Sequence, residues 1–205
     1  MRTRSEAGSS LADKRLFLYA LLTLAALLGA LFGALCWCYG SGRLSELLGS
    51  AKESYLSARR CGDVTRLLLG ALTGMGTFLL AELLLSLSAV GQPFEVALPF
   101  LRGTVCGVIL VSVNGGELNA PALLRTVAVF PGVLISLIIT VLAAREAVCL
   151  SDRLFRICFA GEQSDGLFAR IKLCGARFAV LTAAMSAGAL VDCGLSMLVL
   201  SFGKA

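Results

Sequence analysis

Three charged side chains stand inside long apolar stretches of this 205-residue chain: Glu82, Arg102 and Asp192. Charged groups in such positions are costly in lipid, face protein or water, and recur in ion pairs, ion pathways and proton relays. Glu82 and Arg102 fall at similar estimated depths in neighbouring predicted helices, which favours a structural ion pair between them. A relay for an ion or a proton would use the same residue types. Asp192 lies at a different estimated depth from Glu82 and Arg102.

The remaining sequence offers little other chemistry. The chain has no histidine, which excludes Ser-His-Asp catalysis, histidine zinc sites and histidine ligation of haem. Cys36 and Cys38 form a single Cys-x-Cys, which is too little for a metal site without further ligands. No phosphate-binding loop, nucleotide fingerprint or nucleophile–base pair is present. The sequence therefore predicts no catalytic residues, no metal and no cofactor, and a protein that is not an enzyme.

The composition indicates which elements position the three charges. Apolar residues make up 58% of the chain, charged residues 15%, and the mean hydropathy is +0.88. Ordinary soluble domains are about 45–50% apolar and about 25% charged. This balance excludes a disordered chain and favours a membrane protein with several spans. The net charge of +5 is placed at the edges of the apolar runs without interleaved aromatics, so nucleic acid is not an expected partner.

Five apolar runs are long enough to cross a bilayer, which takes about 20 residues. They are 16–39, 67–90, 96–113, 126–144 and 178–202. None alternates with period two, so we expect helices and not a barrel. The first run follows a basic start but is longer than a signal-peptide core and lacks a small-residue cleavage site, which predicts an uncleaved first helix. The expected fold is all-α: a polytopic membrane bundle of five transmembrane helices, formed by 16–205 after a tail, 1–15.

Basic residues set the expected orientation. With the N-terminus inside, the tail 1–15 and the connection 145–177 place ten basic residues on the cytoplasmic side, against seven outside. Positive residues are enriched in cytoplasmic connections. The sequence therefore predicts a multi-pass protein of the cell membrane with 1–15 and 145–177 in the cytoplasm and 40–66 outside.

The two long connections each allow two interpretations. Segment 40–66 has apolar residues at helical spacing, which suit either a helix lying on the outer leaflet or a docking surface for an extracytoplasmic partner. Connection 145–177 is expected to continue the fourth helix along the membrane surface, to break at 161–166, and to present a basic edge to anionic lipid or to a cytoplasmic protein. The candidate partner surface is Leu44, Leu47, Leu48, Tyr55 and Leu56. The basic edge is Arg153, Arg156, Arg170, Lys172 and Arg177.

Glycines recur four residues apart in three of the runs. The pairs are Gly29 and Gly33, Gly70 and Gly74, and Gly103 and Gly107. Small residues at this spacing let helix backbones approach closely in lipid. Three pairs in three different helices favour a compact bundle more than a specific homodimer, although a homo-oligomer stays possible.

Short sequence segments in and next to the third and fourth apolar runs resemble those of a known protein family. Residues 98–107 read LPFLRGTVCG, 122–131 read ALLRTVAVFP, and 145–155 read REAVCLSDRLF. Their order, the five spans and the acidic residue in the last span resemble the stage II sporulation protein M family of endospore-forming bacteria. The resemblance implies a non-enzymatic protein of the mother-cell membrane at the sporulation septum. Such proteins act in engulfment, where they anchor and localise two peptidoglycan-degrading partners, stage II proteins D and P.

Two functions follow from these observations. The first is a membrane scaffold for a septal peptidoglycan-degrading complex, implied by the resemblance. The alternative is a small transporter or permease-like membrane subunit. A transporter needs a polar site or pathway within the spans and depends on Glu82, Arg102 and Asp192 chemically, whereas a scaffold tolerates changes there that preserve folding.

Overall fold

The computed structural model describes residues 4–39, 49, 64–114, 120–161 and 166–202. Within these ranges the chain forms five α-helices and no strand. The helices are α1 (Arg4–Tyr39), α3 (Val64–Ser86), α4 (Gln92–Asn114), α5 (Ala120–Ala160) and α6 (Leu167–Phe202). The all-α prediction is confirmed. The candidate partner surface in 40–66 lies outside the described residues.

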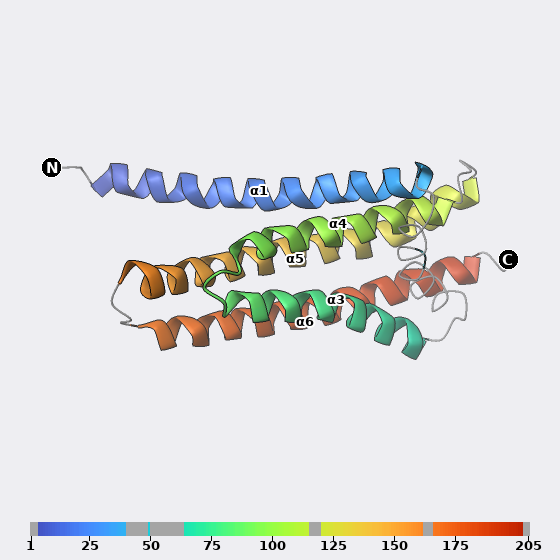
Figure 1. Cartoon of the computed structure of the whole chain (residues 1–205). Helices are drawn as coiled ribbons and strands as arrows, with labels where there is room; N and C mark the ends of the chain where they lie inside the picture. The colour runs from blue at the N-terminus through green and yellow to red at the C-terminus, as the bar shows by residue number, and fades with distance from the viewer. Residues whose placement is uncertain (1–3, 40–48, 50–63, 115–119, 162–165, 203–205) are drawn as a thin grey trace.

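All five helices are long and apolar enough to cross a membrane. The first span, Leu16–Tyr39, has the predicted bounds, and the others are displaced by up to sixteen residues at one end. The protein is therefore a multi-pass membrane protein. The N- and C-terminal ends lie at opposite ends of the bundle, as an odd number of crossings requires (Figure 1).

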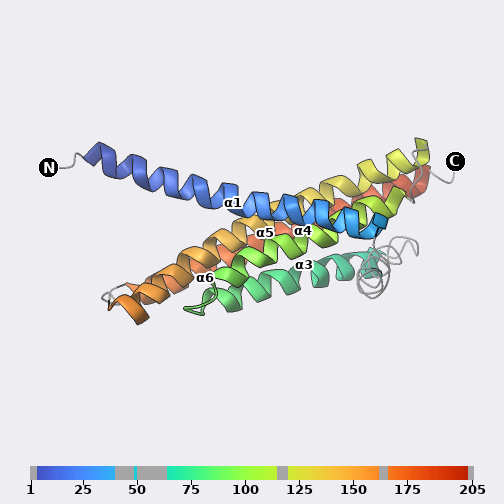
Figure 2. The same cartoon turned by 45° about the horizontal axis from the view of Figure 1, so that its top comes forward.

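The helices pack around α5, which contacts all four of the others. α3 and α6 lie beside one another, and α1 lies over α4 and crosses the bundle at an angle (Figures 1 and 2). One apolar cluster joins α3, α5 and α6 and includes Leu79, Ile139 and Phe178. A second joins α4 to α5 through Cys106, Ile109 and Val133. The space between these two clusters contains the polar site described below.

α1 and α4 meet through glycines. Gly29 and Gly33 on α1 face Gly103 and Gly107 on α4, and a methyl group added to any of the four would overlap a backbone carbonyl of the opposite helix. The lack of side chains allows the two backbones to touch, which is how parallel helices associate without a hydrophobic driving force. Two of the three predicted glycine pairs therefore form one helix–helix contact.

Connection 145–177 agrees with the prediction in part. α5 continues the fourth helix unbroken to Ala160, as predicted, and this continuation stays packed on α6. Ala147 and Leu150 share one face of α5 and meet Cys174 and Phe178 on α6 in the same buried cluster. This apolar stripe, matched by α6, holds the two helices together as a long hairpin. The break predicted at 161–166 is present, and Gly161 and Gly166 flank it.

Candidate functional site

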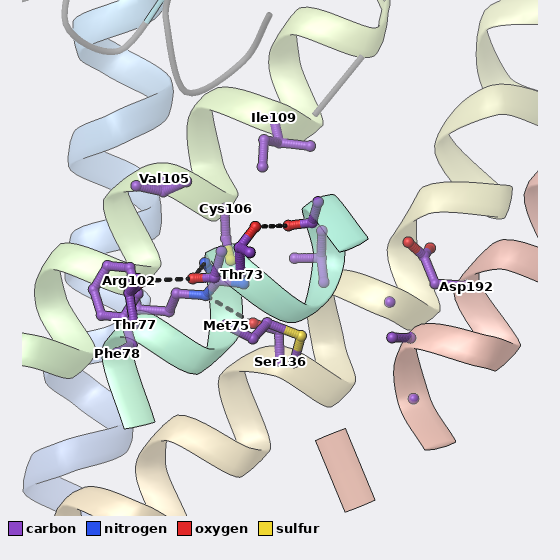
Figure 3. Close-up of a pocket in the computed structure, with 16 residues that line it drawn as sticks. Thr73, Met75, Thr77, Phe78, Arg102, Val105, Cys106, Ile109, Ser136 and Asp192 are labelled. Carbon is purple, nitrogen blue, oxygen red and sulfur yellow. Dashed lines mark hydrogen bonds between the residues drawn. The ribbon is translucent and has the colours of Figure 1, made fainter. Parts of the chain in front are cut away.

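A pocket of about 300 Å³ lies between α3, α4, α5 and α6, within the membrane-spanning parts of all four helices (Figure 3). Two of the three charges singled out from the sequence, Arg102 and Asp192, line it. The structure thus brings together residues from the third and fifth predicted spans. The other polar or sulfur-bearing side chains on its wall are Thr73, Met75, Thr77, Cys106 and Ser136.

Arg102 is held in place by two other helices. Its Nε donates to the Ser136 hydroxyl on α5 at 2.8 Å, and its Nη1 donates to the Gly74 carbonyl on α3 at 3.3 Å. The guanidinium also lies 5.2 Å from the centroid of the Phe78 ring, where the ring face attracts a cation. These contacts fix the charge against the pocket wall.

Asp192 comes from α6 and is 5% exposed. Its carboxylate lies against Gly132 on α5, where a methyl group would overlap the Asp192 side chain. Ser136, which accepts from Arg102, lies one turn further along the same face of α5. Asp192 and Arg102 thus contact positions one turn apart on α5, and Figure 3 shows the two on different walls of the pocket.

The wall formed by α3 is open. Gly70 and Gly74, the third predicted glycine pair, both line the pocket, and a methyl group at either would meet nothing within 4 Å. Thr73 and Thr77 are exposed and donate their hydroxyls to carbonyls of their own helix. This glycine pair thus leaves space beside the polar wall and makes no helix–helix contact of the α1–α4 kind.

Glu82 does not pair with Arg102, so the predicted ion pair is wrong. Glu82 lies outside the pocket and is fully buried beside Glu95, the charged group that acts on it electrostatically. α3 ends at Ser86, so Glu82 is only one turn from the end of its helix, while Arg102 reaches towards Ser136 instead. The sequence interpretation missed Glu95 because it placed this residue in a turn. Its spacing from Pro99 and Arg102 is helical, and that signal would have placed it on the inner face of α4.

The predicted basic edge divides into two groups. Arg177 pairs with Glu146, which also binds Arg145, and Arg145 lies 5.1 Å from the centroid of the Tyr19 ring. These contacts tie α1, α5 and α6 together, so Arg177 has a structural role. The other group is Arg153, Arg156, Arg170 and Lys172, of which Arg156 pairs with Asp152 at 2.8 Å and Arg170 and Lys172 are exposed.

The pocket combines features of a small-molecule site. Such sites are concave and mostly apolar, with a few placed polar groups, and have volumes of about 300–1,000 Å³. Here a guanidinium and a carboxylate line different walls. That arrangement suits a small molecule that carries both a negative and a positive group.

Comparisons with known proteins identify no relative of this chain. No family model matches the chain, no curated protein matches it, and no solved structure matches it. Membership of the stage II sporulation protein M family therefore stays a prediction from the sequence.

Proposed function

We propose that this protein is a small transporter or permease-like membrane subunit that binds a zwitterionic molecule in the pocket between α3, α4, α5 and α6. The observation that carries the proposal is the presence of Arg102 and Asp192 on the wall of one pocket within the spans. Charged residues at such depth are costly and usually mark a substrate or ion pathway. This is the alternative that the sequence left open.

The chemistry of the walls defines the ligand. A guanidinium has five N–H donors, and the bonds to Ser136 and Gly74 use two of them. The remaining donors suit a carboxylate or a phosphate, which arginine binds with paired hydrogen bonds. Asp192 supplies the negative charge for an ammonium group. Amino acids and the headgroup of phosphatidylethanolamine share this chemistry.

We expect Gly74→Leu to weaken ligand binding while leaving the fold intact. A methyl group at Gly74 meets nothing within 4 Å, so the leucine side chain has space to enter the open side of the pocket. Binding of labelled amino acids to protein in nanodiscs should weaken by at least about tenfold, equivalent to ~1.4 kcal/mol. The control is Gly175→Leu on α6, which also meets nothing and does not line the pocket.

The lipid composition of the nanodiscs separates the two sources of ligand. A soluble zwitterion should bind equally well with and without phosphatidylethanolamine, whereas a lipid ligand should co-purify only from membranes that contain it. Arg102→Gln should remove binding in either case. If wild-type protein binds neither ligand, or if Gly74→Leu binds as tightly as Gly175→Leu, the pocket is not the binding site.

The septal scaffold is a separate proposal that rests on the sequence resemblance and does not involve the pocket. It places the protein on the mother-cell side of the sporulation septum, with stage II proteins D and P as partners. We expect polar replacements of Leu47, Leu48 and Tyr55 to leave the protein at normal abundance but to prevent septal localisation of the partners. Fluorescence microscopy of tagged partners in sporulating cells measures this, and unchanged localisation at normal abundance would count against this contact surface.

A further inference from the structure

Two glutamates lie next to the turn that joins α3 and α4. Glu82 is one turn before the end of α3, Glu95 is in the first turn of α4, and the side chains of both are 0% exposed. Glu82 and Glu95 stand on the two sides of the same short turn between α3 and α4, and Glu95 is the charged group that acts on Glu82 electrostatically. Neither lines the pocket.

A second, independent observation concerns their bonding. None of the four carboxyl oxygens accepts a hydrogen bond from any residue that the structure describes. Buried polar groups in proteins are nearly always hydrogen-bonded. Two buried carboxyl groups without partners therefore require something else to satisfy them.

The groups on the surrounding helices are committed elsewhere. The Ser86 hydroxyl donates to the Leu83 carbonyl at 2.7 Å, and the Ser151 hydroxyl on α5 donates to the Ser88 carbonyl at 2.8 Å. The cations bind other groups too: Arg102 on α4 binds Ser136 and Gly74, while Arg145 on α5 and Arg177 on α6 bind Glu146. Among the residues that the structure describes, the other charged or titratable groups on this part of the packed helices include Tyr19 on α1, Cys149, Asp152 and Arg153 on α5, and Cys174 on α6.

Protonation of a carboxyl would relieve this unfavourable arrangement. Two ionised carboxylates side by side, both out of water and with no counter-ion, repel each other and lose their hydration. A proton on one of the two carboxyls removes the charge of that group and halves the charge of the pair. Two carboxylates alone supply few ligands for a divalent ion such as Ca²⁺, which takes six to eight oxygens.

We propose that Glu82 and Glu95 form a proton-binding site, a pair of buried carboxyls that holds at least one proton at neutral pH. Hydronium in the water at the end of the bundle where the α3–α4 turn lies supplies the proton: its O–H bond breaks as the carboxyl O–H bond forms, and a water molecule is released. The site is separate from the pocket and does not depend on the nature of the ligand there.

Infrared spectroscopy of the purified full-length chain in nanodiscs tests the proposal. At pH 7, wild-type protein should show the carbonyl stretch of a protonated carboxylic acid, which shifts in heavy water. Glu82→Gln and Glu95→Gln should each remove or displace this band, and each substitution keeps the shape of the protonated acid. Glu146→Gln is the matched control and should leave the band unchanged, because Glu146 is paired with arginines.

Three results would overturn the assignment. The first is a wild-type spectrum without a protonated carboxyl at pH 7. The second is a band that survives in both the Glu82→Gln and the Glu95→Gln protein. The third is a band that disappears when sodium or potassium chloride replaces a buffer free of these ions, because a metal cation would then be the occupant.

Discussion

Gly33→Leu is expected to detach α1 from the rest of the bundle. The backbone of α4 occupies the place of any side chain at this position, since even a methyl group would overlap the Thr104 carbonyl. A backbone carbonyl cannot move aside as a flexible side chain can, so the helices must separate. Over-packing a tight contact costs about 1–3 kcal/mol and occasionally more. We expect a loss of stability near the upper end of this range, because separating the two helices also breaks the contacts of Gly29, Gly103 and Gly107.

Thermal unfolding of the detergent-solubilised protein measures this loss. The matched control is Gly194→Leu on α6, where an added methyl group meets nothing within 4 Å. Gly107→Leu should reproduce the effect from the other helix, because its added side chain would overlap the Ala30 carbonyl. Equal melting temperatures for Gly33→Leu and Gly194→Leu would show that α1 does not pack on α4 through its glycines.

The stability of the wild-type protein is expected to fall as the pH rises from 6 to 9. If the Glu82–Glu95 pair holds a proton that the unfolded chain releases, the folded state binds more protons, and stability falls with increasing pH. Each such proton corresponds to about 1.4 kcal/mol per pH unit across the range where it is lost on unfolding. Glu82→Gln should flatten this dependence and raise stability at high pH.

Melting curves at matched ionic strength measure the pH dependence. Asp152→Asn is the control, since the Asp152 side chain is 45% exposed and pairs with its helical neighbour Arg156, and its profile should follow that of the wild type. Because Glu82 has no cationic partner among the residues that the structure describes, its neutralisation should not reduce accumulation of the protein. A pH profile that is as steep in Glu82→Gln as in the wild type would assign the effect to other groups.

The number and approximate places of the helices could be predicted because they depend on a local property. A run of about 20 apolar residues is sufficient to identify a span, and Leu16–Tyr39 was placed to the residue. The predicted span 126–144 was too short, because the membrane-spanning part of α5 extends to Ala160. Residues 145–160 contain several charges, and only the matching stripe on α6, with Cys174 and Phe178, shows why α5 remains packed there.

The partners of the charged residues could not be predicted because they depend on helix rotation. Depth along a helix follows from the rise of about 1.5 Å per residue, and by depth Glu82 and Arg102 were plausible neighbours. The direction of the Arg102 side chain depends on which face of α4 meets α1. Gly103 and Gly107 determine that face, and their facing partners are known only once the helices are packed.

The glycine contact between α1 and α4 also bears on how the chain enters the membrane. Ribosomes add about 5–20 residues per second, so the 75 residues from 40 to 114 take about 4–15 s to make. During that interval α1 is in the bilayer while its main partner is still being synthesised. Its sequence suits this delay, because leucines and phenylalanines surround the helix, and within 16–39 only Leu22 and Ala26 among the apolar side chains are buried in the finished bundle. α1 can thus be released early as a stable lipid-facing helix and captured later by α4.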